Sequence, residues 1–271
     1  MKTIHAVSFS PAGKTKAVAE MVAKDLGEQL SLPVMTDSFT LPSARKHPRM
    51  YSADDLVVFA TPTYAGRVPN KALPFVQTLF QGNGAKAIAL VTFGNRSFDH
   101  ALAELCHELT AHGFHVIGAA AVVCTHSFAE IGTGRPDEED RRILQNAIAH
   151  IATNLKEDAE DAVLTVPGGS PPWEYYQPMG IYGEKTVFLK AIPVADARCD
   201  KCGVCATLCP MGSIPADAPD TTTGICIKCQ ACVRFCPQGA RAFLDEAFLS
   251  HKAMLEKNYT RRAGTEVFIP R

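Results

Sequence analysis

Hydrophobic residues along positions 1–160 follow two alternating patterns. Short apolar runs with β-branched and aromatic members predict strands at 3–9, 33–39, 56–60, 86–93 and 119–125. Apolar residues three or four positions apart predict helices between the strands, at 14–30, 71–80, 97–112 and 137–156. Because strands and helices alternate at these lengths, we expect an α/β fold with a doubly wound parallel sheet of five strands. Ligands of such sheets bind beyond the carboxyl ends of the strands.

Three loops follow predicted strands and would meet at that edge. The first reads Ser10-Pro11-Ala12-Gly13-Lys14-Thr15 and leads into a helix, whose free N–H groups and dipole favour a phosphate. The other two read Thr61-Pro62-Thr63-Tyr64-Ala65-Gly66 and Phe93-Gly94-Asn95. We expect a flat aromatic ligand with one phosphate. Tyr64 offers a ring to stack on it, and the glycines admit close approach of backbone N–H groups.

Two features of this edge admit a second interpretation. Gly13-Lys14-Thr15 matches the end of the nucleotide-binding motif G-x-x-x-x-G-K-[ST], but Ser8 stands where the first glycine is required. Nucleotide hydrolysis is therefore disfavoured. His126 and Ser127 follow the fifth predicted strand. We interpret them either as a ligand or proton-relay position or as ordinary loop residues.

Eight of the ten cysteines form two copies of the pattern C-x2-C-x2-C-x3-C-P. Each copy in this spacing gives three thiolates to one 4Fe–4S cluster and its fourth to the other cluster. We therefore define a cluster-one set, Cys199, Cys202, Cys205 and Cys236, and a cluster-two set, Cys226, Cys229, Cys232 and Cys209. Zinc sites need only two pairs of ligands and disulfide frameworks suit short secreted chains, so both fit less well. Cys106 and Cys124 lie in apolar patterns and are expected to be buried.

The order of these patterns predicts two domains joined by a linker rich in proline and glycine. The expected boundaries are 1–160 for the first domain, 161–190 for the linker, 191–247 for the cluster domain and 248–271 for a C-terminal helix and tail. The periodicity at 245–257 predicts that helix. Three aromatic residues of the linker, Trp173, Tyr175 and Tyr176, are expected to pin one domain to the other.

Charge and hydropathy narrow the classes of function. The sequence has 27 Lys and Arg residues against 28 Asp and Glu residues, and each oxidised cluster with its thiolates would add about two negative charges. Because there is no basic stripe with interleaved aromatic residues, nucleic acid is not an expected partner. No apolar run is long enough for a membrane span and the first residues do not form a signal peptide, so we expect a cytoplasmic protein.

The cysteine repeats resemble those of the bacterial two-cluster ferredoxins. The first loop resembles the Ser/Thr-x-Thr-Gly-Asn-Thr loop that holds the FMN phosphate in flavodoxins, and the whole chain resembles the flavodoxin/ferredoxin fusion family. The resemblance implies a flavodoxin-like sheet order 2-1-3-4-5, a small α+β ferredoxin domain, two 4Fe–4S clusters, and FMN held by the three loops.

The resemblance also implies a function. It implies an electron-transfer protein or oxidoreductase that relays electrons between a low-potential redox partner or small acceptor, the clusters and FMN, alone or as a homodimer. A two-cluster ferredoxin whose flavodoxin-like domain lacks flavin and serves for docking stays open as the alternative. Ala12 lacks a hydroxyl of the flavodoxin loop, a loss worth about ten- to a hundredfold in affinity. Lys14 offsets this loss as a counter-charge to phosphate.

The phosphate assignment predicts the effect of reversing the charge at Lys14. A Lys14→Glu substitution should expel FMN, because a carboxylate would face the phosphate, while the visible absorbance of the clusters stays unchanged. Flavin and iron content of the purified variant would be measured together. Stoichiometric flavin in this variant would contradict the assignment.

Overall fold

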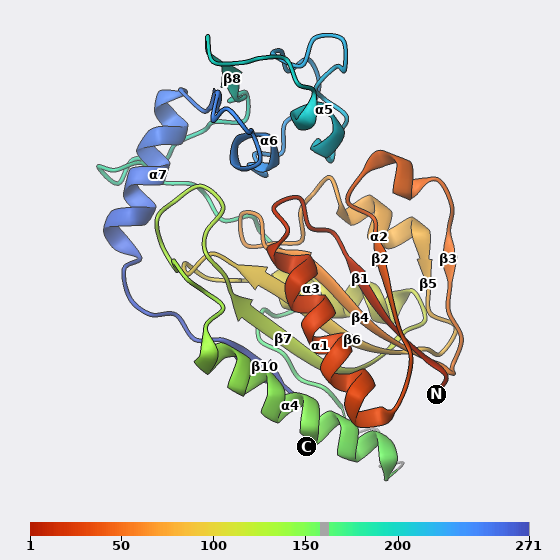
Figure 1. The fold of residues 1–271 in the computed structure, drawn as a ribbon. Coiled ribbons are helices and arrows are strands. Elements are labelled where there is room, and N and C mark those ends of the chain that lie inside the picture. Colours follow the sequence, from red (N-terminus) through yellow and green to blue (C-terminus); the bar gives the residue numbers. More distant parts are fainter. Residues whose placement is uncertain (158–162, 271) are drawn as a thin grey trace.

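The computed structural model describes residues 1–157 and 163–270 of the chain. The expected boundary between the first domain and the linker, at 160–161, lies outside these residues. A six-stranded sheet lies at the centre of the fold, in the order β10-β7-β6-β4-β1-β2 (Figure 1). Its strands are β1 (Thr3–Ser8), β2 (Val34–Ser38), β4 (Asp55–Pro62), β6 (Lys86–Phe93), β7 (His115–Val123) and β10 (Glu266–Phe268).

Five of the six strands are parallel, which confirms the expected order 2-1-3-4-5. β1 pairs with β2 and β4, β4 pairs with β6, and β6 pairs with β7. The sixth strand, β10, runs antiparallel to β7 and sets Val267 opposite Ala120. The sequence pattern does not predict β10, because three residues are too few to show an alternation. The strand covers backbone groups that the edge of β7 would otherwise leave unpaired.

Helices cover both faces of the sheet, and we call the sheet with these helices the sheet body. α1 (Lys14–Leu30) and α4 (Glu138–Lys156) pack on one face, and α2 (Leu73–Leu79) and α3 (Ala101–Ala111) pack on the other. Successive residues of β4 point to opposite faces, so Val58 packs on the first side and Phe59 on the second. α3 begins later than its pattern predicts because Asp99 has a φ of 44°, which no α-helix accepts.

The cysteine repeats form a smaller unit, the cysteine segment, which lies over the carboxyl edge of the parallel strands (Figure 1). Its two short strands pair antiparallel, and the helix α7 that follows agrees within one residue with the expected helix. The elements of this part are β8 (Val194–Ala195), α5 (Val204–Leu208), α6 (Ala231–Arg234), β9 (Arg241–Ala242) and α7 (Glu246–Asn258). The remaining short elements, in the sheet body, are η1 (Pro42–Arg45), β3 (Arg49–Met50) and β5 (Phe80–Gln81). No helix of the described residues is long and apolar enough to cross a membrane.

The linker aromatics pack on the sheet body. The Arg67 guanidinium pairs with the buried carboxylate of Glu104, and its Nη1 donates to the Trp173 carbonyl at 3.0 Å. The same guanidinium lies over the Tyr175 ring, 4.4 Å from its centre, and Arg96 lies 3.8 Å from the centre of the Tyr176 ring. These cation–π contacts and the hydrogen bond hold the linker on the sheet body, while the predicted role of the aromatics in joining the two domains stays a prediction.

The C-terminal tail returns to the sheet body through a buried ion pair at the start of α4. Arg135 is 5% exposed and forms a bidentate pair with Asp140, which is fully buried. Arg135 Nη1 also donates to the Ala263 carbonyl at 3.0 Å, and the Thr265 hydroxyl donates to Asp140 at 2.6 Å. The pair thus joins α4 to the residues that lead into β10.

This network predicts the consequence of removing one charge. An Arg135→Ala substitution leaves the Asp140 carboxylate buried without its partner, and we expect the free energy of unfolding to fall by about 3–5 kcal/mol. The control is Arg262→Ala, because Arg262 pairs with Asp137 and Glu139 at the surface, where solvent screening leaves such pairs little effect on stability. Urea unfolding followed by far-UV circular dichroism compares the two. If both variants lost the same free energy of unfolding, burial of the Arg135–Asp140 pair would not matter for stability.

Candidate functional site

A cavity of about 530 Å³, partly open to solvent, lies at the carboxyl ends of β1, β4, β6 and β7. We call it the rim cavity. All three predicted loops reach it, and the predicted residues that line it are Ser10, Ala12, Lys14, Thr15, Pro62, Thr63, Tyr64, Phe93 and Gly94. The structure thus brings together loops that are far apart in the sequence. Five other predicted residues are described but do not line it: Gly13, Thr61, Ala65, Gly66 and Asn95.

Those five residues belong to the same loops and strand ends, where each has a role in the structure of the chain itself. Gly13 precedes α1 with a φ of 85°, and Thr61 is fully buried within β4. Ala65 and Gly66 form the left-handed tip of a turn that Tyr64 and Arg67 close with two backbone hydrogen bonds. The Asn95 amide holds the tail instead of a ligand, since its Nδ2 donates at 2.7 Å to the carbonyls of Tyr259 and Arg261. These tail residues lie too far along the chain for the sequence to predict that bond.

The first loop presents positive charge to the rim cavity. α1 begins without a side-chain cap, and among the described residues the N–H groups of Lys14 and Thr15 have no hydrogen-bond partner, so these two are open to an anion. The Ser10 hydroxyl accepts from the Lys16 N–H at 2.9 Å, and the Thr15 hydroxyl lies 2.7 Å from that of Thr92. The Ser10 hydroxyl accepts in its bond and so keeps its own proton to donate to a ligand. Among the described residues Lys14 has no ion-pair partner, so its ammonium is available to a ligand in the cavity that it lines.

The second loop carries Tyr64 to the boundary between the rim cavity and the cysteine segment. Tyr64 lines the cavity and is partly buried. Burial raises the pKa of its hydroxyl well above the usual value, and the nearby sulfurs of Cys229 and Cys226 raise it further. The neighbouring Thr63 hydroxyl is buried and finds no hydrogen-bond partner among the described residues. A ligand in the cavity would supply the missing partner.

His126 adds a fourth loop, after β7, to the wall of the rim cavity. Its Nδ1 accepts hydrogen bonds from the backbone N–H groups of Phe128 at 3.3 Å and Ala129 at 3.1 Å. Burial, reinforced by the positive charges of His251 and Arg96, lowers the pKa of His126 to about 4. The ring is therefore neutral near pH 7 and its proton is on Nε2. Of the two interpretations left open for His126, its place in the wall favours a ligand position.

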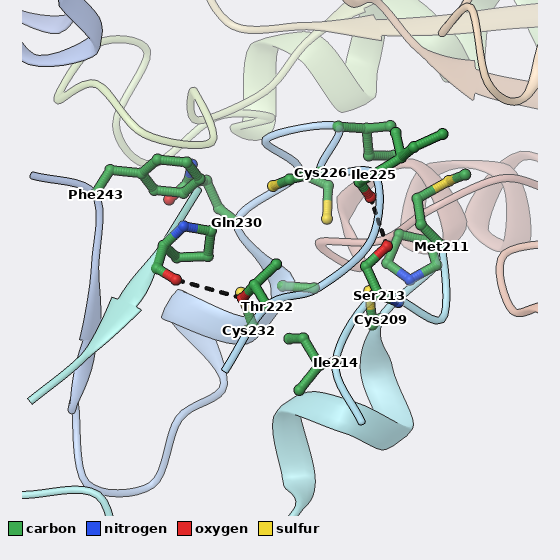
Figure 2. Close-up of a pocket in the computed structure, with 15 residues that line it drawn as sticks. Cys209, Met211, Ser213, Ile214, Thr222, Ile225, Cys226, Gln230, Cys232 and Phe243 are labelled. Carbon is green, nitrogen blue, oxygen red and sulfur yellow. Dashed lines mark hydrogen bonds between the residues drawn. The ribbon is translucent and has the colours of Figure 1, made fainter. Parts of the chain in front are cut away.

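Two further cavities lie in the cysteine segment, and each is lined by one predicted cysteine set. The cluster-one set lines a cavity of about 290 Å³ and the cluster-two set lines one of about 380 Å³. Figure 2 shows Cys209, Cys226 and Cys232 around the second cavity. Cys209 thus joins the cysteines of the other repeat, and Cys236 joins those of the first. This grouping is the exchange expected from the spacing of the repeats.

Hydrogen-bond donors lie close to sulfur atoms of both sets. Backbone N–H groups donate to the sulfurs of Cys209 and Cys236, from Ser213 and Ala240, at 3.3 Å each. The buried Arg241 lies 3.7 Å from the Cys205 sulfur through Nη1, while its Nε is buried without a partner. No group of three His, Cys, Asp or Glu side chains in residues 1–157 and 163–270 is arranged around a single ion. A cubane makes a different demand, because each thiolate binds its own iron at a separate corner.

Cys106 and Cys124 stand apart from the two sets. Cys124 is 4% exposed and Cys106 is half-buried against the core, and burial raises the pKa of both thiols to about 12. Both thiols are therefore protonated near neutral pH, as expected for packing residues.

Several solved structures are similar to part of this chain. No protein-family model and no curated protein matches the chain. Similar solved structures include a flavodoxin from the domain Archaea, with 18% identity over 58% of this chain and 99% of that chain and a TM-score of 0.41. A Streptococcus pneumonia TIGR4 flavodoxin has 20% identity over 56% of this chain and 99% of that chain, with a TM-score of 0.41.

A third solved structure is rubredoxin oxygen:oxidoreductase from the anaerobe Desulfovibrio gigas. It has 15% identity over 58% of this chain and 37% of that longer chain, with a TM-score of 0.42. With identities this low, the ligands of the present chain have to be inferred from its own site.

The environment of His126 predicts its titration. Its side-chain ¹⁵N signals should keep the Nε2–H tautomer from pH 8 to pH 5, because the pKa in the folded state is about 4. The unfolded value is about 6.5, so this group's contribution to stability is complete above about pH 6.5 and is lost as the pH falls towards 4. In Gly94→Ala the added methyl would lie 2.2 Å from Cδ2 of the ring, so His126 should leave the wall and titrate at higher pH. A midpoint near pH 6.5 in the unaltered chain would contradict this description.

Proposed function

We propose that this chain is an electron-transfer iron–sulfur flavoprotein. It binds FMN in the rim cavity and two 4Fe–4S clusters on the cluster-one and cluster-two sets, and it relays electrons between a low-potential redox partner, the clusters and FMN. The observation that carries the proposal is the position of Tyr64, which lines the rim cavity and lies within electrostatic range of the sulfurs of Cys226 and Cys229. This neighbourhood supports electron transfer within one chain.

The chemistry of the rim cavity supports FMN as its ligand. The open N–H groups at the start of α1 and the unpaired ammonium of Lys14 suit a phosphate. Tyr64 and Gly94 suit a flat ring, and the unpartnered hydroxyl of Thr63 suits a polar atom at its edge.

The chemistry of the two cysteine cavities supports 4Fe–4S clusters. Each cavity is lined by four cysteines drawn from both repeats, as two-cluster binding requires. The N–H donors at 3.3 Å from Cys209 and Cys236 would stabilise thiolates. The unpartnered Nε of Arg241 would find an acceptor in the sulfide of a bound cluster.

The side chains have distinct roles in the proposed relay. When bound, FMN exchanges one or two electrons and each cluster exchanges one. Lys14 balances the phosphate charge, Tyr64 contributes an aromatic side chain at the boundary between flavin and cluster two, and His126 holds a proton at Nε2 in the cavity wall. Cys202 of the cluster-one set is exposed, so a redox partner has access to that cluster.

Cofactor content and paired cysteine variants test the proposal. The anaerobically purified protein should hold about eight iron atoms and one FMN per chain. Removing a cysteine of either set should remove about four iron atoms. Cys209→Ala should share the residual spectrum of Cys229→Ala, and Cys236→Ala that of Cys202→Ala, because each pair lines one cavity.

Other outcomes would contradict parts of the proposal. If Cys209→Ala instead resembled Cys202→Ala, the exchange of cysteines between the repeats would be wrong. Eight iron atoms without FMN, even after FMN is added, would identify a two-cluster ferredoxin whose sheet body serves for docking.

A further inference from the structure

One side chain of the cysteine segment reaches the rim cavity. Arg234 is the last residue of α6 and stands two residues after Cys232 of the cluster-two set. Among the described residues that line the cavity, every other one belongs to the sheet body, in the last residues of β4 and β6, the loops after β1, β4, β6 and β7, or the first turn of α1. Figure 1 shows α6 above the edge where these strands end. Arg234 therefore joins the two parts of the chain at the proposed flavin site.

The guanidinium of Arg234 is available to a ligand. It is exposed and has no hydrogen-bond, ion-pair or aromatic partner within residues 1–157 and 163–270. The contrast is Arg241, seven positions further on, whose guanidinium donates to the Pro193 and Pro219 carbonyls and to the Thr222 hydroxyl. An unpaired cation that lines a cavity is a candidate ligand for an anion.

The cysteine repeat itself does not require an arginine at this position. The segment from Cys232 to Cys236 aligns with the segment from Cys205 to Cys209, and Thr207 takes the place of Arg234. Both residues are exposed and both lie on the helix inside the repeat. Only the repeat that faces the rim cavity carries the charge there.

We propose that Arg234 binds the phosphate of FMN, so that flavin affinity depends on cluster two. This inference rests on the proposed function and adds a ligand that the flavodoxin-like loops do not contain. The phosphate carries about two negative charges, while Lys14 supplies one positive charge and the hydroxyls of Ser10 and Thr15 supply none. A guanidinium supplies the second charge and binds phosphate through two parallel N–H donors.

The dependence on cluster two follows from the size of α6. A helix of four residues does not hold its own conformation in water. Cys229 and Cys232 stand before and within α6, so binding of their sulfurs to a cluster would fix the helix and the direction of Arg234. By thermodynamic linkage, the factor by which the cluster raises FMN affinity is also the factor by which FMN raises cluster affinity.

Flavin titrations of the cluster-loaded full chain test the phosphate contact. FMN and riboflavin differ by the phosphate, and quenching of their fluorescence reports binding of each. In Arg234→Ala we expect FMN affinity to fall about ten- to a hundredfold, the loss of one hydrogen bond to a charged group, and riboflavin affinity to stay unchanged. Arg234→Lys should lose less. Lys257→Ala removes an exposed cation from α7 and should change neither affinity.

The same titrations on the chain stripped of iron test the linkage. Loss of the clusters should weaken FMN binding to the unaltered chain and have little effect on Arg234→Ala, in which the contact is already absent. Equal FMN affinity in Arg234→Ala and the unaltered chain, or equal weakening of FMN and riboflavin, would overturn the phosphate contact. FMN binding that is indifferent to the clusters would overturn the linkage. An unaltered, cluster-loaded chain that binds neither flavin would overturn this inference together with the proposed function.

Discussion

The cysteine segment is held to the sheet body at both of its ends, and this double attachment determines where its sulfur atoms lie. On the entering side, the Arg67–Glu104 pair anchors the linker through the Trp173 carbonyl. On the leaving side, β10 extends the sheet and the Arg135–Asp140 pair holds the residues before it. A unit with so small a core of its own gains a defined position from these two anchors.

The anchors set the cysteine segment over the one edge of the sheet where a doubly wound fold binds ligands. Within this one chain, Tyr64 then stands between the rim cavity and the cluster-two set. The helix α5 joins the two cysteine cavities, because Cys205 in its first turn lines the cluster-one cavity and Cys209 at its C-cap lines the cluster-two cavity. Such an order suits the proposed relay, in which a partner would meet the cluster-one cavity at the exposed Cys202 and FMN would bind in the rim cavity.

The features that the sequence predicts are those that depend on local pattern or fixed spacing. The parallel strands have long apolar runs, and the exchange of Cys209 and Cys236 follows from the spacing of the repeats. The sequence does not predict β10, the hydrogen bonds of the Asn95 amide to the tail, or the place of Arg234 in the wall of the rim cavity. Each of these depends on segments that meet only in the folded chain. Asn95 and Tyr259, for example, are 164 positions apart, and no periodicity relates them.

The central claim is that clusters and flavin exchange electrons within one chain. The most direct measurement is the rate of FMN reduction after rapid reduction of the clusters, followed by absorbance over a wide range of protein concentrations. Electron transfer within one chain gives a first-order rate constant that does not change with protein concentration. A rate constant that rises in proportion to concentration would mean that electrons pass between separate chains, and transfer within one chain would be wrong.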